Sequence, residues 1–470
     1  MHKRIIIALV MAILLTGCML GPQYRRPAVK SPEVFRGSTE TTPPADPTSL
    51  ADLQWFEVFN DEQLQELIWT ALVHNYDLRD AVARVSAARA NLGITRAEQF
   101  PQIVASADLT ILRQSRSGAQ SIPADMERDR TFGSVLLNLL SFEVDIWGRL
   151  RRATEAARAD VLAAEENRSA VITTLVSDVA TAYFTLLALD MALEIARRTL
   201  ASREASLRLI TVRQQGGIAT LLDVHQAEQL VYSAAQTIPD TERQVEQTEN
   251  QISVLLGQHP GGVTRGRRLT AQEQPPTVPP GLPSALLERR PDIRAAEQTL
   301  IAANADIGVA KAAYFPQISL TGLLGYESNQ LANLFKSSTG FWQFVPQVTQ
   351  PIFTAGRITS QVRLAEALQQ SALVQYERAI QTAFREVSDA LVEYRRVKEV
   401  RTQQELLVTA LQARSNLAYM RYQGGVDTLL NALDADRDLF NAELSLAQTR
   451  RNELLALVQL YKALGGGWQQ

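Results

Sequence analysis

Two stretches of 67 residues, 149–215 and 357–423, contain neither glycine nor proline. These are the residues that most readily end a helix, so their absence favours one helix over each stretch. At 1.5 Å per residue, each helix would be about 100 Å long. Along the second stretch, apolar residues can be traced from Val362 to Val397 at a mean step of about 3.5 residues, the coiled-coil period. The chain is therefore expected to fold around very long helices that pack as coiled coils.

The second stretch and its surroundings repeat the first at an offset of 208 residues. "RQQGGIATLLDVHQAE" at 213–228 returns as "RYQGGVDTLLNALDAD" at 421–436, and Gly148-Arg149 returns as Gly356-Arg357. Upstream, "EQFPQI" (98–103) matches "AYFPQI" (313–318) at an offset of 215. Self-similarity on this scale predicts two copies of one structural unit rather than a solenoid of short repeats.

Each copy also contains two segments with the pattern of strands. Before them, a helical run is stopped by Pro101 in the first copy and by Pro316 in the second. Apolar and polar residues then alternate with period two, which predicts strands with one polar face. The expected strands are 102–114 and 132–147 in the first copy and 317–327 and 341–354 in the second. Pro346 and Pro351 weaken the fourth, because proline cannot donate to a strand ladder.

The glycine pairs that follow the long stretches predict chain reversals, because glycine adopts the left-handed conformation that ends a helix. Return helices are expected over 218–256, with a kink at Pro239, and over 426–464. The first structural repeat then covers 50–256 and the second 284–470, joined by a Pro/Gly-rich linker at 257–283. The basic "GGVTRGRR" within it lacks the preceding strand and following helix that a phosphate-binding loop requires. The predicted fold class is mainly α with a β portion, in the order helix, strand, strand, long helix, turn, helix.

The N-terminus has the pattern of a secretory signal over residues 1–17, with Lys3 and Arg4 before an apolar core. It runs into Leu15-Thr16-Gly17-Cys18, which resembles a bacterial lipobox whose cysteine is lipidated; an ordinary signal peptide that carries a cysteine is the alternative. Cys18 is the only cysteine, so no internal disulfide is possible. Met19 stands where an aspartate would imply retention in the inner membrane. Six prolines between residues 18 and 49 predict an extended, lipid-anchored tether.

Composition excludes several classes of function. The net charge of −3 provides no basic footprint for nucleic acid. The four histidines are dispersed and no metal, nucleotide or hydrolase motif is present, so we expect neither an enzyme nor a bound metal or cofactor. Four strands cannot close a membrane barrel alone, since the smallest single-chain barrels have eight. Either the strands form a small soluble sheet or several chains pool them; three chains would give twelve.

Four segments carry a resemblance to a known family: "GPQYRRP" (21–27), "LQWFEVFNDEQLQELIWTAL" (53–72), "GLPSALLERRPDIRAAE" (281–297) and "LYKALGGGW" (460–468). With them the chain resembles the TolC/OprM-like outer-membrane efflux proteins, in the lipoprotein branch that serves resistance-nodulation-division (RND) pumps. The resemblance implies a homotrimer with a twelve-stranded β-barrel in the outer-membrane lipid, continuous with an α-helical tunnel in the periplasm. It also implies a passive exit duct, a periplasmic membrane-fusion adaptor and an inner-membrane RND-type pump as partners, and palmitate on Cys18.

The resemblance further implies that the two turns form a tip to which the adaptor docks; simple hairpin turns are the alternative. The implied docking residues are Gly216, Gly217, Ile218, Thr220, Leu221, Gly424, Gly425, Val426, Thr428 and Leu429. A periplasmic gate is implied at Leu430, Asn431 and Asp434. In a trimer three leucines would form a plug, and three nearby carboxylates would repel. The alternative is a solvated helix face on which Asp434 pairs with Arg437.

Two other functions fit parts of the sequence. One is the outer-membrane duct of a type I protein-secretion system, against which the lipobox and "GLPSALLERRPDI" argue. The other is a lipid-anchored periplasmic coiled-coil scaffold without a pore.

Overall fold

The computed structural model describes residues 19–29, 32, 35–36, 49–117, 123, 125, 127–272 and 283–468. The expected signal peptide and Cys18 lie outside the described residues. The chain divides into two compact units, and each takes segments from both sequence repeats. Unit 1 comprises Met1–Ala28, Val85–Ala164 and Ala296–Tyr376, and unit 2 comprises Val29–Arg84, Glu165–Ala295 and Glu377–Gln470.

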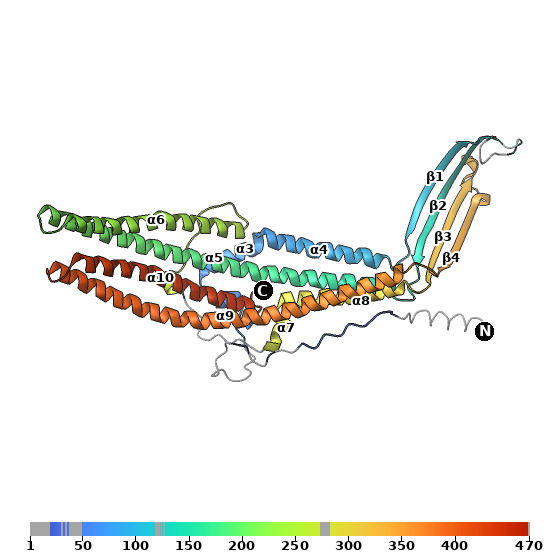
Figure 1. The fold of residues 1–470 in the computed structure, drawn as a ribbon. Helices are drawn as coiled ribbons and strands as arrows, with labels where there is room; N and C mark the ends of the chain where they lie inside the picture. Colours follow the sequence, from blue (N-terminus) through green and yellow to red (C-terminus); the bar gives the residue numbers. More distant parts are fainter. Residues whose placement is uncertain are drawn as a thin grey trace. The chain divides into compact units, whose positions relative to one another are not determined.

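The elements follow the predicted order in both repeats (Figure 1). The first repeat contains η1 (Leu50–Asp52), α2 (Trp55–Val58), α3 (Glu62–His74), α4 (Tyr76–Ala97), β1 (Ile103–Arg113), β2 (Asp129–Glu143), α5 (Arg149–Gln215) and α6 (Leu221–Leu255). After η2 (Leu269–Ala271), the second contains η3 (Pro283–Ala285), α7 (Leu286–Arg289), α8 (Pro291–Ala312), β3 (Gln317–Ser328), η4 (Leu331–Asn333), η5 (Ser337–Thr339), β4 (Gly340–Thr349), α9 (Arg357–Gln423) and α10 (Leu429–Ala463).

The long helices match the sequence-based ranges, whereas the return helices and the strands differ from them by a few residues at their ends. The long helices α5 and α9 cover the expected 67 residues each. The return helices begin three residues later than expected, because Thr220 and Thr428 are extended N-cap residues. Strand β2 begins earlier than expected, and β4 ends at Thr349, ahead of Pro351. Pro239 lies inside α6.

In unit 1 the strands form one antiparallel sheet in the order β1-β2-β3-β4. Paired residues share a face, so the register assigns the side chains to two faces. One face is almost entirely apolar: Ile103, Ala105, Ala107, Leu109, Ile111, Val135, Leu137, Leu139, Ile318, Leu320, Leu324, Trp342, Phe344, Pro346 and Val348. The other, which we call the polar face, carries the polar residues Ser106, Asp108, Thr110, Arg130, Ser134, Asn138, Ser319, Thr321, Glu327, Gln343 and Gln347, together with the apolar residues Val104, Leu112, Phe132, Leu136, Leu323, Phe341 and Val345.

The apolar face of the sheet is not covered by the chain's own packing. Ile111 is 74% exposed, Leu324 58% and Trp342 75%. In a folded chain, a contiguous apolar surface of this size marks a contact with another molecule or with lipid.

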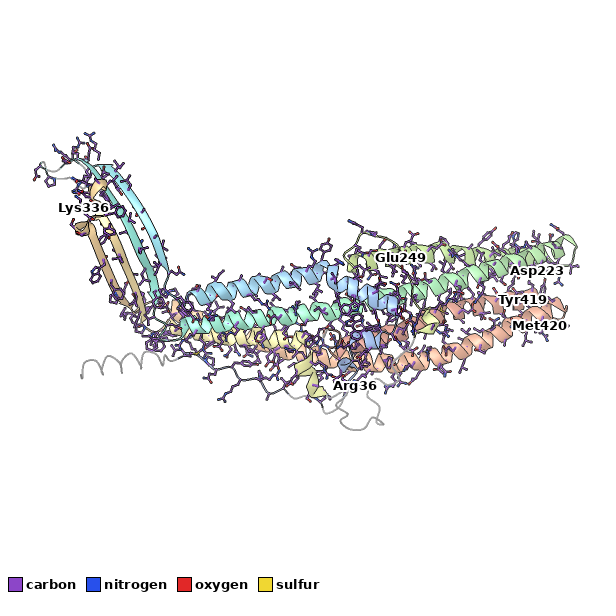
Figure 2. All side chains as sticks on the ribbon, turned by 180° about the vertical axis from the view of Figure 1, so that it is seen from behind. Arg36, Asp223, Glu249, Lys336, Tyr419 and Met420 are labelled. Carbon is purple, nitrogen blue, oxygen red and sulfur yellow. The ribbon has the colours of Figure 1, made fainter. Side chains whose placement is uncertain are left out.

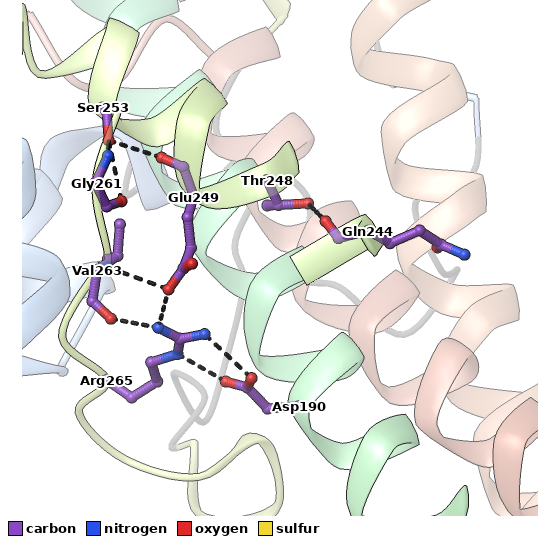
Figure 3. A network of polar contacts seen from close by, with 8 residues as sticks. All are labelled: Asp190, Gln244, Thr248, Glu249, Ser253, Gly261, Val263 and Arg265. Carbon is purple, nitrogen blue, oxygen red and sulfur yellow. Dashed lines mark hydrogen bonds and ion pairs between the residues drawn. The ribbon is translucent and has the colours of Figure 1, made fainter. Parts of the chain in front are cut away.

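Unit 2 has a continuous core, in which Trp55, Tyr183 and Tyr461 are fully buried. The described part of the predicted linker is built onto this core rather than loosely attached. In Figure 3, Arg265 lies between Asp190 and Glu249, with 2.9 Å from Arg265 Nε to Asp190 Oδ2. The N–H of Gly261 donates to Ser253 Oγ at 3.2 Å. The linker therefore helps to close one end of the core.

A buried carboxylate, Asp61, fixes the same loop from inside. It is 1% exposed, and it accepts hydrogen bonds from the N–H groups of Gln63 and Leu64, from Tyr183 Oη, from the N–H of Arg267 and from Gln272 Nε2. Tyr183 Oη accepts in turn from the N–H of Gly266 at 2.9 Å. Burial, the largest cause, raises the pKa of Tyr183 above its ordinary value, and the nearby Asp61 acts in the same direction.

We expect Asp61→Ala to destabilise the fold, because the variant leaves several buried donors without an acceptor. Each such group costs about 1–3 kcal/mol. The matched control is Asp80→Ala, which removes an exposed carboxylate paired with Arg84 at 2.7 Å. Thermal unfolding followed by circular dichroism should show a clear loss for Asp61→Ala alone; equal midpoints in the two variants would contradict the assignment.

Candidate functional site

The two helical hairpins of unit 2 reverse direction with the same backbone geometry. Gly217 and Gly425 both have φ of 74°, in the left-handed region. The N–H of Ile218 donates to the carbonyl of Arg213 at 2.8 Å, and the N–H of Val426 donates to that of Arg421 at 3.0 Å. This six-to-one bond after a left-handed glycine is the Schellman motif, which satisfies carbonyls at a helix end. The second glycine of each pair, Gly217 or Gly425, is therefore required by the backbone of its turn.

The two turns differ in how the returning helix is capped. In the first, Thr220 and Asp223 form a capping box, with 2.7 Å from the N–H of Thr220 to Asp223 Oδ2. In the second, Asn431 occupies the position of Asp223 and the acid stands at Asp427. Asp427 accepts from Asn431 Nδ2 at 2.7 Å, from the N–H of Thr428 at 2.8 Å and from Arg421 Nε at 3.1 Å. Asn431, a predicted gate residue, is thus engaged in closing the turn.

These bonds set the charge state of the second turn. The hydrogen bond from Asn431, followed by those from Thr428 and Arg421, lowers the pKa of Asp427. Because the folded turn lowers the pKa of Asp427, these hydrogen bonds stabilise the fold fully at any pH above the ordinary pKa of an aspartate. The stabilisation is lost as the pH falls through the lowered pKa of Asp427. The cap is therefore intact at neutral pH.

The predicted docking residues fall into an exposed and a buried set. Ile218, Leu221 and Val426 are exposed, as are Thr220, Thr428 and the four glycines. Leu429 is only 4% exposed. It packs with Leu433, Ile210, Val224 and Leu230 in a small core between the hairpins. In Figure 2, Asp223, Tyr419 and Met420 mark this end of unit 2. Ile218, Leu221 and Val426 thus offer an apolar surface, which Leu429 supports from inside.

The predicted gate residues Leu430 and Asp434 lie one turn apart on α10. Leu430 is 50% exposed. Asp434 is paired within its own helix, with 3.1 Å from its Oδ1 to Arg437 Nη1. This ion pair is the one expected for a solvated helix face, and it leaves the Asp434 side chain partly accessible at 37%. The two residues can therefore contribute to a constriction only when other copies of the chain face them.

Sequence reasoning missed the most buried charge near the turns, Arg203 on α5. Its side chain is 3% exposed and that of Asp436 on α10 is 13% exposed, with 2.7 Å between Nε and Oδ2. Nη1 also donates to the carbonyl of Leu230 at 2.9 Å, and the guanidinium lies 4.8 Å from the ring centroid of Phe440. Arg203 therefore joins α5, α6 and α10 at one point.

A sequence signal for Arg203 did exist. It lies seven residues after Ala196 and seven before Ile210, both of which are core positions of the coiled coil. A charged residue in that register specifies how helices pair, at some expense of stability.

Of the residues that the structure describes, no three His, Cys, Asp or Glu side chains gather into a metal-ligating group.

Comparison with known proteins identifies the family. The sequence profile of the family described as "Outer membrane efflux protein" matches residues 67–258 and 282–466. The chain belongs to the outer membrane efflux protein family. The resemblance inferred from "GPQYRRP" and the other three segments is thereby confirmed. The protein is an efflux channel of the outer membrane.

Relatives of this outer membrane efflux protein match it over nearly their full length. The "Probable efflux pump outer membrane protein TtgC" of Pseudomonas putida is 38% identical over 100% of this chain and 97% of its own. The "Cation efflux system protein CusC" of Escherichia coli is 37% identical over 98% of each chain. Among solved structures, the open state of the Neisseria gonorrhoeae MtrE outer membrane channel superposes with a TM-score of 0.86, at 34% identity over 96% of this chain and 99% of that one. The predicted helical fold with four strands per chain is confirmed.

We expect Arg203→Leu to destabilise the contact between the hairpins, because Asp436 is left buried without a counter-charge. Removing one partner of a buried pair typically costs about 3–5 kcal/mol. The matched control is Arg414→Leu, which breaks an α9–α10 ion pair, to Asp438 at 2.8 Å, whose side chains are 51% and 36% exposed. An exposed pair is worth about 0–1 kcal/mol. Hydrogen exchange of the α10 amides should accelerate in Arg203→Leu only; similar exchange in both variants would contradict a special role for Arg203.

Proposed function

We propose that this protein is the exit duct of a tripartite RND-type efflux system, formed by three copies of the chain. The observation that carries this proposal is the four-stranded sheet with one apolar and one polar face. The apolar face, which contains Leu324 and Trp342, suits lipid. The polar face, with Ser106 and Asn138 hydrogen-bonded at 2.9 Å, suits a water-filled lumen. A scaffold without a pore would not require a sheet with one apolar face and one polar face.

The edges of the sheet explain why several copies are required. Strands β1 and β4 each have a single neighbour within the chain. In the hydrocarbon core an unpaired backbone edge is too costly, so a spanning sheet must be closed. Pairing β4 of one copy with β1 of the next satisfies both edges, and three copies give twelve strands. The resemblance to trimeric family members supports three rather than another number.

The proposed partners are inferred from the two helical turns of unit 2 and from the descriptions of the relatives. The relatives are described as outer membrane proteins of efflux pumps, and a duct of this kind needs an inner-membrane pump to drive transport. We assign Ile218, Leu221 and Val426 to the surface that receives a periplasmic membrane-fusion adaptor, since they are exposed and apolar at both turns. The chain supplies a passage and no catalytic step.

The gate belongs to the same proposal. In a trimer, Leu430 and Asp434 would each occur three times around the axis, and a ring of three leucines excludes water and ions. Arg203 holds α10 to the first hairpin through Asp436, two residues further along the helix from Asp434. Opening the gate therefore requires α10 to move against this pair or together with it. We also propose that Cys18 is acylated, with palmitate among its chains.

The lipid-facing assignment can be tested with adjacent residues of β3. We expect Leu324→Arg to prevent assembly, because an arginine on the lipid face costs about 2–4 kcal/mol near the bilayer centre in each copy. Leu323→Arg places the same side chain one residue away on the polar face and should be tolerated. Recovery of trimers from outer membranes provides the measurement. Loss of trimers in Leu323→Arg together with normal recovery of Leu324→Arg would reverse the assignment of the faces.

The gate assignment can be tested in planar bilayers. We expect Leu430→Ala and Asp434→Ala each to raise the single-channel conductance, because a smaller side chain widens the narrowest ring. The control is Leu222→Ala, the equivalent position of the first repeat, which is also exposed. Conductance unchanged in both gate variants, or raised equally by Leu222→Ala, would show that the constriction lies elsewhere.

A further inference from the structure

The basic segment 261–268, "GGVTRGRR", lies against α5 in unit 2, and a cavity is left beside the helix. The volume of this cavity is about 280 Å³. Pockets that hold drug-sized ligands measure about 300–1,000 Å³. The cavity therefore has room for one ring with a short substituent and not for a nucleotide or a peptide. An exit duct assigns no role to it.

The floor of the cavity is apolar. Leu187, Met191 and Ile195 of α5 follow one another at a spacing of four residues, which places them on one face of the helix. Leu269 of η2 lines the cavity from the side of the loop. Leu187, Ile195 and Leu269 are buried, and Met191 packs against the cores of unit 2. An apolar ring placed on this floor would be removed from water, which favours its binding.

The rim of the cavity is basic. Among the described residues that line it there are four arginines and two carboxylates. Arg265 and Arg198 are engaged in ion pairs at 2.9 and 2.6 Å. Glu194 lies 3.9 Å from Arg268, and their side chains are 65% and 81% exposed, so this pair contributes little. Arg268 is therefore placed to pair with an anionic group at the rim, where guanidinium groups outnumber carboxylates.

The loop that carries these arginines is fixed in place. In Figure 3, Arg265 is held between carboxylates of α5 and α6. The N–H of Gly266 donates to Tyr183 Oη at 2.9 Å. The N–H of Arg267 donates to Asp61 Oδ2 at 3.1 Å. A Cβ on Gly266 would collide with the Asp61 carboxylate, so only glycine permits this approach. A ligand would therefore bind without first ordering the loop, which lowers the entropic cost of binding.

We propose that the cavity binds a small aromatic carboxylate, with its ring on the floor formed by α5 and η2 and its carboxylate at Arg268. A monoanion suits the site better than a phosphate monoester does, because Asp190 and Glu194 line the same cavity and repel a second negative charge. A phosphate monoester carries about 1.5 to 2 negative charges at neutral pH. The site goes beyond the proposed exit duct, since it requires neither the trimer nor the pump.

Binding at this cavity stabilises unit 2. The loop that forms one wall of the cavity also closes one end of the core, where Asp61 fixes it. A ligand that binds the folded loop and not the unfolded chain shifts the unfolding equilibrium toward the folded state as its concentration rises. The midpoint of thermal unfolding should therefore increase with the concentration of the carboxylate once that concentration exceeds the dissociation constant.

The class of ligand is tested by isothermal titration calorimetry of the purified full chain in detergent, at constant ionic strength. Benzoate should bind at one site per chain. Benzamide has the ring without the charge and acetate has the charge without the ring, so each should bind at least about tenfold more weakly. Absence of saturable benzoate binding overturns the site, and equally tight binding of benzamide or acetate overturns its assigned chemistry. Tighter binding of phenyl phosphate than of benzoate overturns the choice of a carboxylate.

The location of the site is tested at two exposed rim positions. Thr270→Trp adds bulk at the rim and should abolish benzoate binding, whereas Arg268→Gln removes the charge and should weaken it at least about threefold. The matched control is Arg197→Gln, which removes an exposed arginine of α5 that pairs with Glu242 at 2.6 Å and does not line the cavity. Thermal unfolding without ligand should be the same in all three variants, because the replaced side chains are exposed. Unchanged affinity in Thr270→Trp, or equal losses in Arg268→Gln and Arg197→Gln, overturns the site.

Discussion

The requirement that every backbone hydrogen-bonding group in a bilayer has a partner decides what this chain can be. A sheet of four strands has two open edges, β1 and β4, and one uncovered apolar face. In water the face would aggregate, and in lipid the edges would be unsatisfied. Closure with other copies of the chain, as proposed above, would pair both edges and leave the apolar face to lipid. In that arrangement each chain supplies one segment of the closed sheet.

The duplication preserved the backbone and altered the chemistry. The two turns share the glycines and the six-to-one hydrogen bond, which depend on φ at Gly217 and Gly425. Their caps differ, because the acid at Asp223 in the first repeat is replaced by one at Asp427 in the second. Leu222 and Leu430 correspond, whereas Asp434 corresponds to Gln226. Equivalent helices thus occupy equivalent positions in the two repeats, while only the second carries a carboxylate at the position of Asp434.

The structural features that the sequence predicts are those determined by residues close to one another in the chain. The bounds of α5 and α9 follow from glycine and proline, and the strands follow from a period of two, so both required only neighbouring residues. The contact between the N-terminal segment and α8 could not be predicted, since Pro22 and Asn304 are 282 positions apart. Asp61 has the sequence pattern of an ordinary N-cap, and its contact with Arg267 joins residues 206 positions apart. The family resemblance implies that Leu429 belongs to the docking surface, but its side chain is buried against residues of the facing hairpin.

The buried pair of Arg203 and Asp436 sets how α5 and α10 are aligned near the turns of the coiled coil. Packing of apolar side chains alone permits neighbouring helices to slide, because one leucine position resembles the next. A charged pair inside the seam favours one register, because a shift of one helix would separate Arg203 from Asp436 and leave both charges buried without a partner. The same pair is a discrete contact that either holds or is broken. If Asp434 contributes to a gate as proposed, opening it requires the Arg203–Asp436 pair to break or α10 to move together with α5.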